Sequence, residues 1–189
     1  MTAVRDVADV PRTAWRNGAG WTRELGAGTA ASSTKAVSWR LSLADITGPC
    51  SFSIFPGMWR WSTVLAGPPL RLRLGPGHER TVARGVVDYS GEWHVTARPV
   101  DDTDGPAAAV EVLNLMVTTG GAGRLERVAV APGAELPLSP DTVAVVVVRG
   151  QVTLGGTRLG AGCLATDARP GALAAVAAPA SCVVVGVNP

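Results

Sequence analysis

Histidine is almost absent from this chain, and this scarcity argues against one common kind of site. Only His78 and His94 occur, sixteen positions apart. A transition-metal site needs three or more ligands held close together, which two separated histidines do not supply. The sequence also lacks the GxSxG, Walker A and GxGxxG motifs of hydrolase elbows, phosphate loops and dinucleotide folds. We therefore predict no metal and no cofactor.

Cysteine is scarce as well. The three cysteines, Cys50, Cys163 and Cys182, lie far apart and form no CxxC pair. An odd number of widely spaced thiols is typical of reduced, structural cysteines in a cytoplasmic protein. A disulfide between two of them is the less favoured alternative.

Long hydrophobic runs and a dominant charge are also missing. Unbroken aliphatic stretches such as Val143–Val148 are far shorter than a membrane span. Residues 1–10 carry Arg5, Asp6 and Asp9 and lack the apolar core of a secretory signal. The chain has 17 Lys and Arg against 15 Asp and Glu, a net charge of +2. This balance favours neither nucleic acid nor a membrane as a partner.

Glycine and proline, by contrast, are plentiful and regularly spaced. The 189 residues include 23 Gly and 14 Pro, and 47% of them are hydrophobic, enough for a sizeable core. Short apolar runs with a period of two predict a β-sandwich or barrel with little helix. The predicted strands are Val37–Ala44, Ser62–Leu65, Leu70–Leu74, Thr81–Val87, Trp93–Ala97, Val110–Val117, Leu125–Val130, Val143–Val148, Val152–Leu154 and Cys182–Val187. Gly26–Lys35 is predicted to be a flexible loop and Asp45–Thr47 a short turn.

A weak internal repeat divides these strands into two halves. Pro49–Gly67 and Pro132–Gly150 both run from proline through a proline-containing turn and an apolar strand to glycine, at a constant offset of 83 residues that relates Val64 to Val147. The repeat predicts two small jelly-roll-like barrels that join near Val117–Gly123. The first half contains all six Trp and both His, so we expect any site there and a scaffold role for the second half.

Polar residues interrupt apolar strands in the first half. In Ser38–Asp45, alternation puts Arg40 and Ser42 on one face, which either meets water or lines the interior of a barrel. Asn114 interrupts the aliphatic run Val110–Val117, and a buried amide there needs hydrogen-bond partners. A network that stabilises the strand and a contact with a ligand are both open for Asn114.

Three segments of the first half resemble the HutD/Ves family. Trp15–Glu24 (WRNGAGWTRE) is close to the family's W-[KR]-N-G-G-G-x-T-R-E signature, Trp39–Ile46 (WRLSLADI) to W-R-[LIV]-S-[IL]-A-x-I, and Phe52–Arg60 (FSIFPGMWR) to F-S-x-F-P-G-x-x-R. The resemblance spans roughly residues 10–187 in the same order. Trp59 stands where the family often has an acidic residue, a departure that bears on ligand preference.

The resemblance implies a cupin-type fold of RmlC-like jelly rolls. With the repeat, it predicts an all-β, double-cupin-like chain of two jelly-roll-type β-barrel halves, residues 1–120 with the ligand site and residues 121–189 as a structural half. The family accompanies histidine-utilisation genes in many bacteria. The resemblance therefore implies a non-catalytic, small-ligand-binding protein, a regulator or metabolite buffer for histidine catabolism. The expected partner is a small carboxylate metabolite such as formylglutamate or urocanate, and a homodimer is a possible assembly.

Six polar residues are predicted to converge on one cavity in the first half: Asn17, Arg23, Glu24, Arg40, Arg60 and Asn114. Arg40 and Arg60 are the preferred carboxylate contacts, because a guanidinium donates two parallel hydrogen bonds and stays charged. Arg23 and Glu24 are adjacent, so at most one of them points into the cavity from an extended strand. We expect Arg23 to be that residue for an anionic ligand.

An enzymatic alternative remains open. A metal-independent cupin-like lyase or isomerase acting on a small carboxylate needs only one placed carboxylate, with Glu24 as its base, and cationic stabilisers. The scarcity of proton-transfer groups favours the binding protein. A pure interaction scaffold would require that the arginines of the first half be exposed and scattered.

Overall fold

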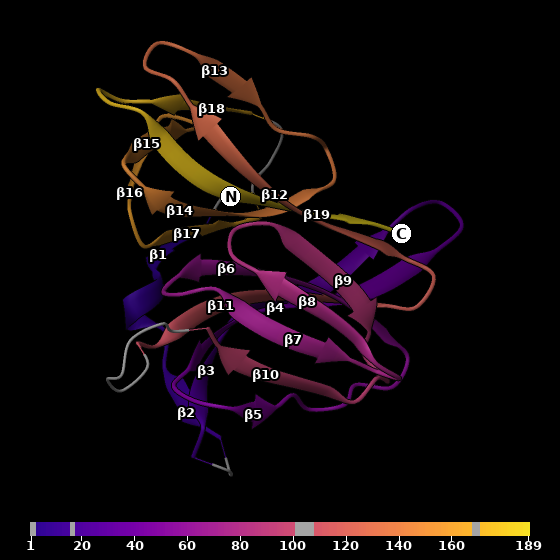
Figure 1. Ribbon diagram of the computed structural model, residues 1–189. Helices are drawn as coiled ribbons and strands as arrows, with labels where there is room; N and C mark the ends of the chain where they lie inside the picture. Colours follow the sequence, from indigo (N-terminus) through magenta and orange to yellow (C-terminus); the bar gives the residue numbers. More distant parts are fainter. Residues whose placement is uncertain (1–2, 16–17, 101–107, 168–170) are drawn as a thin grey trace. The chain divides into compact units, whose positions relative to one another are not determined.

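The computed structural model describes residues 3–15, 18–100, 108–167 and 171–189. This part of the chain is all β apart from one short 3₁₀ helix, and it forms two compact units (Figure 1). The N-terminal unit is Pro11–Gly123, and the C-terminal unit combines Met1–Val10 with Arg124–Asn188. No helix of the described residues is long and apolar enough to cross a membrane.

The N-terminal unit contains two sheets. Its strands are β2 (Arg12–Ala14), β3 (Gly20–Ala31), β4 (Ala36–Ile46), β5 (Cys50–Ser51), β6 (Met58–Ala66), β7 (Leu70–Leu74), β8 (His78–Val82), β9 (Val86–Ser90), β10 (Val95–Pro99) and β11 (Val110–Thr118). One sheet has the order β2-β3-β4-β11-β6-β9 and the other the order β5-β10-β7-β8. A core cluster between strands of both sheets includes Ile46, Leu72, Val95 and Val112.

The C-terminal unit repeats this plan. Its elements are β1 (Ala3–Asp6), η1 (Val7–Asp9), β12 (Ala122–Val130), β13 (Glu135–Pro137), β14 (Thr142–Arg149), β15 (Gln151–Leu154), β16 (Thr157–Gly160), β17 (Cys163–Thr166), β18 (Ala172–Ala175) and β19 (Ala180–Asn188). The sheets have the orders β1-β17-β14-β19-β12 and β13-β18-β15-β16. The core cluster of this unit includes Val145, Val147, Cys182 and Val184.

The strand pairing gives the internal repeat a structural basis. Strand β6 lies between β11 and β9, and β14 lies between β19 and β17. Likewise β7 lies between β10 and β8, and β15 between β18 and β16. The six strands β6–β11 therefore correspond in order and pairing to β14–β19. The predicted pair Val64 and Val147 falls on equivalent strands, opposite Val112 and Cys182 respectively.

Two glycines at the predicted offset end the equivalent strands in the same way. Gly67 follows β6 with φ +92° and Gly150 follows β14 with φ +79°. The space for a Cβ atom is filled at Gly67 by the backbone of Ala109 and Val110, and at Gly150 by that of Pro179 and Ala180. Both neighbouring segments lead into the last strand of their unit. Only glycine combines a positive φ with such a close approach.

The first ten residues depart from the predicted division of the chain. We predicted that residues 1–120 form one half, but β1 pairs with β17, with Ala3 opposite Thr166. The amide of Val7 also donates to the carbonyl of Gly162 at 2.9 Å. This segment belongs to the C-terminal unit because it completes an edge of that unit's five-stranded sheet. Such a pairing between distant segments leaves no local signal in the sequence.

Three local predictions were wrong. Gly26–Lys35 is not a loop throughout, because Gly26–Ala31 belong to β3 and pair with β4, and only residues 32–35 connect the two strands. The glycines accommodate an aromatic ring: a Cβ atom on Gly28 would lie 3.1 Å from the Trp39 ring. The turn predicted at Asp45–Thr47 is the end of β4. The single strand predicted at Thr81–Val87 is two strands, β8 and β9.

Candidate functional site

A polar cavity opens on one face of the six-stranded sheet of the N-terminal unit. Its volume is about 590 Å³, within the usual range of small-molecule pockets. Strands β2, β3, β4, β6 and β11 supply most of its wall, and the segment that contains Phe52 and Phe55 supplies the rest. The lining residues are Thr13, Ala14, Trp15, Thr22, Glu24, Arg40, Ser42, Ala44, Ser51, Phe52, Ser53, Phe55, Arg60, Asn114 and Met116.

Asn114 lies in a hydrogen-bonded row that crosses the sheet. The register places it between Ser42 of β4 and Ser62 of β6. The Ser62 hydroxyl donates to Asn114 Oδ1 at 2.7 Å and lies 3.1 Å from the Tyr89 hydroxyl. The Asn114 amide donates to the carbonyl of Val112 at 3.3 Å. Asn114 therefore belongs to a structural network and also lines the cavity, where its contact with a ligand stays a prediction.

Arg40 and Arg60 lie on either side of Met116, as its register partners, two residues further along β11 than Asn114. Their guanidinium carbons lie 5.9 and 5.2 Å from the centre of the Phe55 ring. These two distances keep the guanidinium carbons within about 11 Å of each other. The two arginines predicted as carboxylate contacts thus share one wall of the cavity.

Arg60 is the more deeply buried of the two, with 5% of its surface exposed. Its guanidinium donates to the carbonyl of Ser53 at 3.2 Å and lies within 6 Å of the ring centres of Phe52, Phe55 and Tyr89. Its Nε–H has no hydrogen-bond partner. None of the ion pairs among the described residues involves Arg60. A buried cation without a counter-ion is costly, and an anion in the cavity would offset that cost.

Arg40 has a partner in the same cavity. Its Nε–H donates to Glu24 Oε2 at 2.7 Å. The Glu24 side chain is 57% exposed and that of Arg40 is 32% exposed, so the pair sits at the solvent-facing side of the pocket. Such an exposed ion pair stabilises little, and its geometry can change at low cost when a ligand enters.

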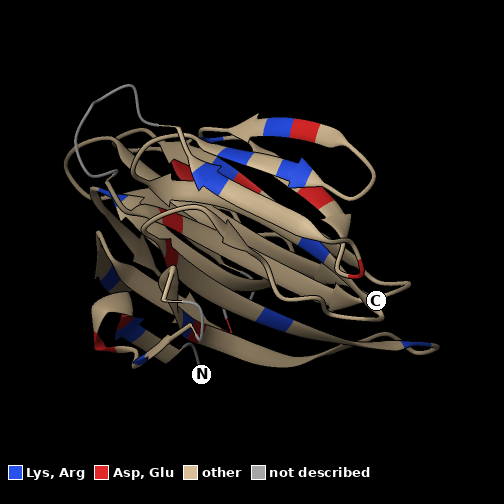
Figure 2. Cartoon of the chain, turned by 60° about the horizontal axis from the view of Figure 1, so that its bottom comes forward, with Lys and Arg blue, Asp and Glu red and all other residues tan. Residues whose placement is uncertain are grey.

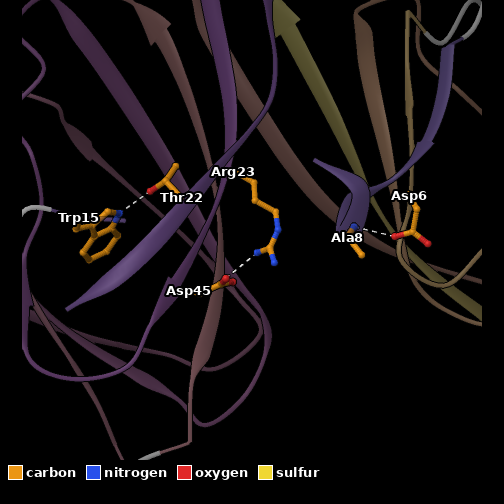
Figure 3. Close-up of polar contacts among 6 residues, drawn as sticks. All are labelled: Asp6, Ala8, Trp15, Thr22, Arg23 and Asp45. Carbon is orange, nitrogen blue, oxygen red and sulfur yellow. Dashed lines mark hydrogen bonds and ion pairs between the residues drawn. The ribbon is translucent and has the colours of Figure 1, made fainter. Parts of the chain in front are cut away.

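Arg23 points away from the cavity, contrary to our expectation. It forms an ion pair with Asp45 at 2.6 Å (Figure 3), whereas its neighbour Glu24 lines the pocket. Alternation along β3 admits one of the two residues, and the structure selects Glu24. Burial raises the pKa of nearby Glu111, the Asp45 carboxylate raises it further, and Arg23 partly offsets both effects.

The rim of the cavity contains Trp15, whose indole N–H donates to the Thr22 hydroxyl at 2.6 Å (Figure 3). The hairpin between β2 and β3 has Gly18 at φ +69°, as expected for the Asn17-Gly18 turn. Asn17 itself lies outside the described residues. Four of the six predicted residues, Glu24, Arg40, Arg60 and Asn114, therefore line one cavity.

Sequence reasoning missed the aromatic side of the site. Phe52 and Phe55 lie inside a recognised motif, but nothing in their spacing indicates that their rings cover the Arg60 guanidinium. Tyr89, fully buried on β9, was also missed. The run of aromatic residues close to an arginine in Phe52–Arg60 was the available signal.

The donor set of the cavity does not suit the metal that many cupin-type folds bind. Its polar wall consists of guanidinium, hydroxyl and amide groups with a single carboxylate, Glu24. Among the described residues, no group of three or more His, Cys, Asp and Glu side chains could hold a metal ion. His78 and His94 do not line this cavity. The three cysteines are free thiols.

Comparison with known proteins gives a family and a fold. The family model described as HutD matches residues 7–182. Protein Ves of Citrobacter koseri is 43% identical over 67 residues, which are 35% of this chain and 34% of that protein. An "uncharacterized 21.2 kDa protein in hutC 3′region" of Pseudomonas putida is 35% identical over 91 residues, 48% of this chain and 47% of that protein. The chain thus spans about half or less of the length of these curated relatives.

Solved structures agree on the fold over the whole chain. The structure of HutD from Pseudomonas fluorescens SBW25 (formate condition) has a TM-score of 0.77 at 24% identity and covers 100% of this chain and 98% of that one. Oxalate decarboxylase from Lactobacillus farciminis, in a formate complex, has a TM-score of 0.65 at 11% identity, with 98% and 86% covered. At these identities the likeness concerns the fold alone. The chain is an all-β protein of the double-cupin type, as the sequence predicted.

Proposed function

Because the chain belongs to the HutD family, we propose that it is a non-catalytic protein that binds a small carboxylate in the cavity of its N-terminal unit. In this proposal it acts as a regulator or metabolite buffer for histidine catabolism. The genomic context of the Pseudomonas putida relative, in the hutC 3′ region, supports the link to that pathway. The same link makes formylglutamate and urocanate the candidate ligands.

One observation carries the proposal: the burial of Arg60 without a counter-ion. Arg60 is 5% exposed and lines a cavity of about 590 Å³. Its Nε–H has no hydrogen-bond partner, and aromatic rings surround it. A carboxylate that accepts two parallel hydrogen bonds would neutralise the charge in a site that already excludes much of the water.

The other lining residues indicate which chemical groups the ligand has besides its carboxylate. The Arg40–Glu24 pair supplies both a donor and an acceptor at the open side, while Ser42, Ser53 and Thr22 supply neutral polar groups. A ligand with one carboxylate at Arg60 and a second polar group near the pair fits this arrangement. Both formylglutamate and urocanate have that combination of an acid and a separate polar group.

The enzymatic alternative has one observation in its favour. Glu24 lines the cavity with Arg40 and Arg60, so a carboxylate and two cations share the space that a lyase or isomerase would need. However, Arg40 already engages Glu24 at 2.7 Å, which occupies the proposed base. This engagement, with the lack of any second proton-transfer group in the lining, favours binding over catalysis.

Calorimetric titration with formate, formylglutamate and urocanate tests the proposal. We expect saturable binding of at least one of them to the wild type. Arg60→Ala should weaken that binding by about 30- to 150-fold, because a charged hydrogen-bond pair in a buried site contributes about 2–3 kcal/mol. Arg158→Ala, an exposed arginine on β16, is the control and should leave affinity unchanged.

The proposal fails if none of the three compounds binds, or if Arg60→Ala binds as tightly as the wild type. Incubating each bound compound with the protein and following it by NMR separates the two functions. An unchanged spectrum supports a binding protein. Steady conversion that Glu24→Gln abolishes, with affinity retained, supports the enzyme instead.

A further inference from the structure

We propose a second anion site on the solvent-facing side of the β5-β10-β7-β8 sheet, formed by Arg71, Arg73 and Arg98, which binds the phosphoryl group of a small phosphorylated molecule. The three arginines line a separate hollow of about 470 Å³ together with Ser51, Thr96 and Glu79, among others. This hollow shares only Ser51 with the lining of the cavity described above.

The register places the three arginines on one face of adjacent strands. Arg71 of β7 lies directly opposite Arg98 of β10, and Arg73 lies opposite Thr96. The intervening Leu70, Leu72 and Leu74 are buried in the core, so the arginines point to the other side of the sheet. Figure 2 shows Lys and Arg on several neighbouring strands of the chain.

Like charges directly opposite each other destabilise a sheet, and no acidic side chain of the described residues forms an ion pair with Arg71 or Arg98. Among the described residues, the side chains of Arg71, Arg73 and Arg98 form no ion pair, hydrogen bond or ring contact. Glu79 is the register partner of Arg73, yet no ion pair joins them. Three arginines whose guanidinium groups have no partner in the described part of the chain thus lie on one face of adjacent strands and line one hollow.

The geometry and composition of the hollow favour a compact, multiply charged oxyanion. Opposite residues on paired strands are about 5 Å apart and alternate residues on one strand about 7 Å, so three long side chains can reach a single small group. Guanidinium groups pair with phosphate oxygens through two parallel hydrogen bonds. The hydroxyls of Ser51 and Thr96 add neutral donors. No aromatic residue lines the hollow, so it offers no surface for stacking a nucleobase.

The equivalent sheet of the C-terminal unit provides an internal comparison. There, β15 and β18 place Thr153 opposite Ala174, and β16 places Arg158 opposite Thr153. Arg158 is the only arginine on the described strands of that sheet. Since the same pairing pattern folds without the three arginines, the fold itself does not require them.

Titration with pyrophosphate at constant ionic strength tests this site. We expect saturable binding of one pyrophosphate per chain, and Arg71→Gln/Arg98→Gln should weaken it by at least about tenfold, since each charged hydrogen-bonding partner contributes on the order of tenfold or more. Arg149→Gln/Arg158→Gln removes the same net charge from the C-terminal unit and is the matched control, which should bind like the wild type. Arg60→Ala should also bind like the wild type, which separates this site from the carboxylate cavity.

Inorganic phosphate and sulfate serve as further probes. Weaker saturable binding of phosphate that the same double variant loses supports the site. The proposal is overturned if pyrophosphate does not saturate, if both double variants weaken binding equally, or if Arg71→Gln/Arg98→Gln binds like the wild type. Loss of pyrophosphate binding in Arg60→Ala alone would assign the anion to the cavity and would also overturn a second site.

Discussion

In the N-terminal unit, the cross-strand pair below the cavity is Ser62 and Asn114, whereas in the C-terminal unit the pair at the equivalent place is Val145 and Val184. All four residues are buried. The polar pair belongs to a hydrogen-bonded network, and the valines belong to the apolar core cluster of their unit. The same succession of strands therefore forms with either interior, so the fold does not require the polar one.

The two equivalent interiors also differ in what their residues contribute to stability. A buried amide and hydroxyl stabilise little beyond what apolar residues of similar shape provide, because folding exchanges water for protein partners. The N-terminal unit nevertheless has polar residues at Ser62 and Asn114 and a buried arginine at Arg60. The proposed binding role accounts for these residues, which the stability of the fold does not require.

The largest expected effect comes from making the C-terminal interior resemble the N-terminal one. Val184→Asn should lower the free energy of unfolding by about 2–4 kcal/mol, because the amide would lie in an apolar cluster without partners. Asn114→Val should cost less than about 1.5 kcal/mol, since Ser62 keeps its contact with Tyr89. Urea unfolding followed by far-ultraviolet circular dichroism, which reports the strands of both units, measures both. Equal losses would contradict the view that the two interiors differ in their need for polar partners.

Substitutions at the two equivalent glycines, Gly67 and Gly150, test whether equivalent positions of the two units contribute similarly to the free energy of unfolding. Gly67→Ala and Gly150→Ala should each destabilise the protein by about 1–3 kcal/mol, because both positions combine a positive φ with a backbone close to the added methyl group. The effect should be larger at Gly67, where the methyl group would overlap the Ala109 carbonyl oxygen. Gly48→Ala, at a position with open space and no positive φ, is the control and should change stability by less than about 0.5 kcal/mol. A neutral Gly150→Ala would limit the equivalence to topology.

A smaller effect is expected at Glu111, a charged position of the N-terminal sheet. Burial and the Asp45 carboxylate raise the pKa of Glu111, with Arg23 opposing them. A carboxyl with a raised pKa in the folded state favours folding at acidic pH, and this contribution is lost as pH rises through that pKa. Glu111→Gln should therefore raise the unfolding midpoint at pH 7 by about 1–3 °C relative to the wild type. The gain should shrink toward pH 4, and a gain that is constant with pH would show that charge is not its cause.

The smallest difference between the units is expected in the reactivity of their buried thiols, Cys50 in the N-terminal unit and Cys182 in the C-terminal unit. Burial raises the pKa of both Cys50 and Cys182 to about 11, so almost no thiolate is present at pH 8. The native protein should react with a thiol reagent at Cys163 only, which is partly exposed, and at all three cysteines once denatured. The absorbance of the product that the reagent releases gives the number of reacted cysteines per chain. Rapid reaction at Cys50 but not at Cys182 would show that the N-terminal unit opens locally more often.

The sequence by itself determined the elements of this protein. Its period-two apolar runs, separated by glycine and proline, predicted most strands, because alternation is a local property of extended chains. The offset between Val64 and Val147 predicted the repeat, and the motifs around Arg40 and Arg60 predicted two residues of the cavity wall. Asn114 could be singled out because a polar residue in a buried strand has to find partners.

Only the tertiary structure decided which neighbours those elements acquire. Alternation states that Arg23 and Glu24 face opposite ways, but the pairing of β3 with β4 decides that Glu24 faces the cavity. The addition of β1 to the C-terminal sheet and the cover of Phe52 and Phe55 over Arg60 likewise depend on contacts between distant segments. A sequence pattern fixes which residues share a face of one strand. Burial of the whole core selects which face turns inward and which strands lie side by side.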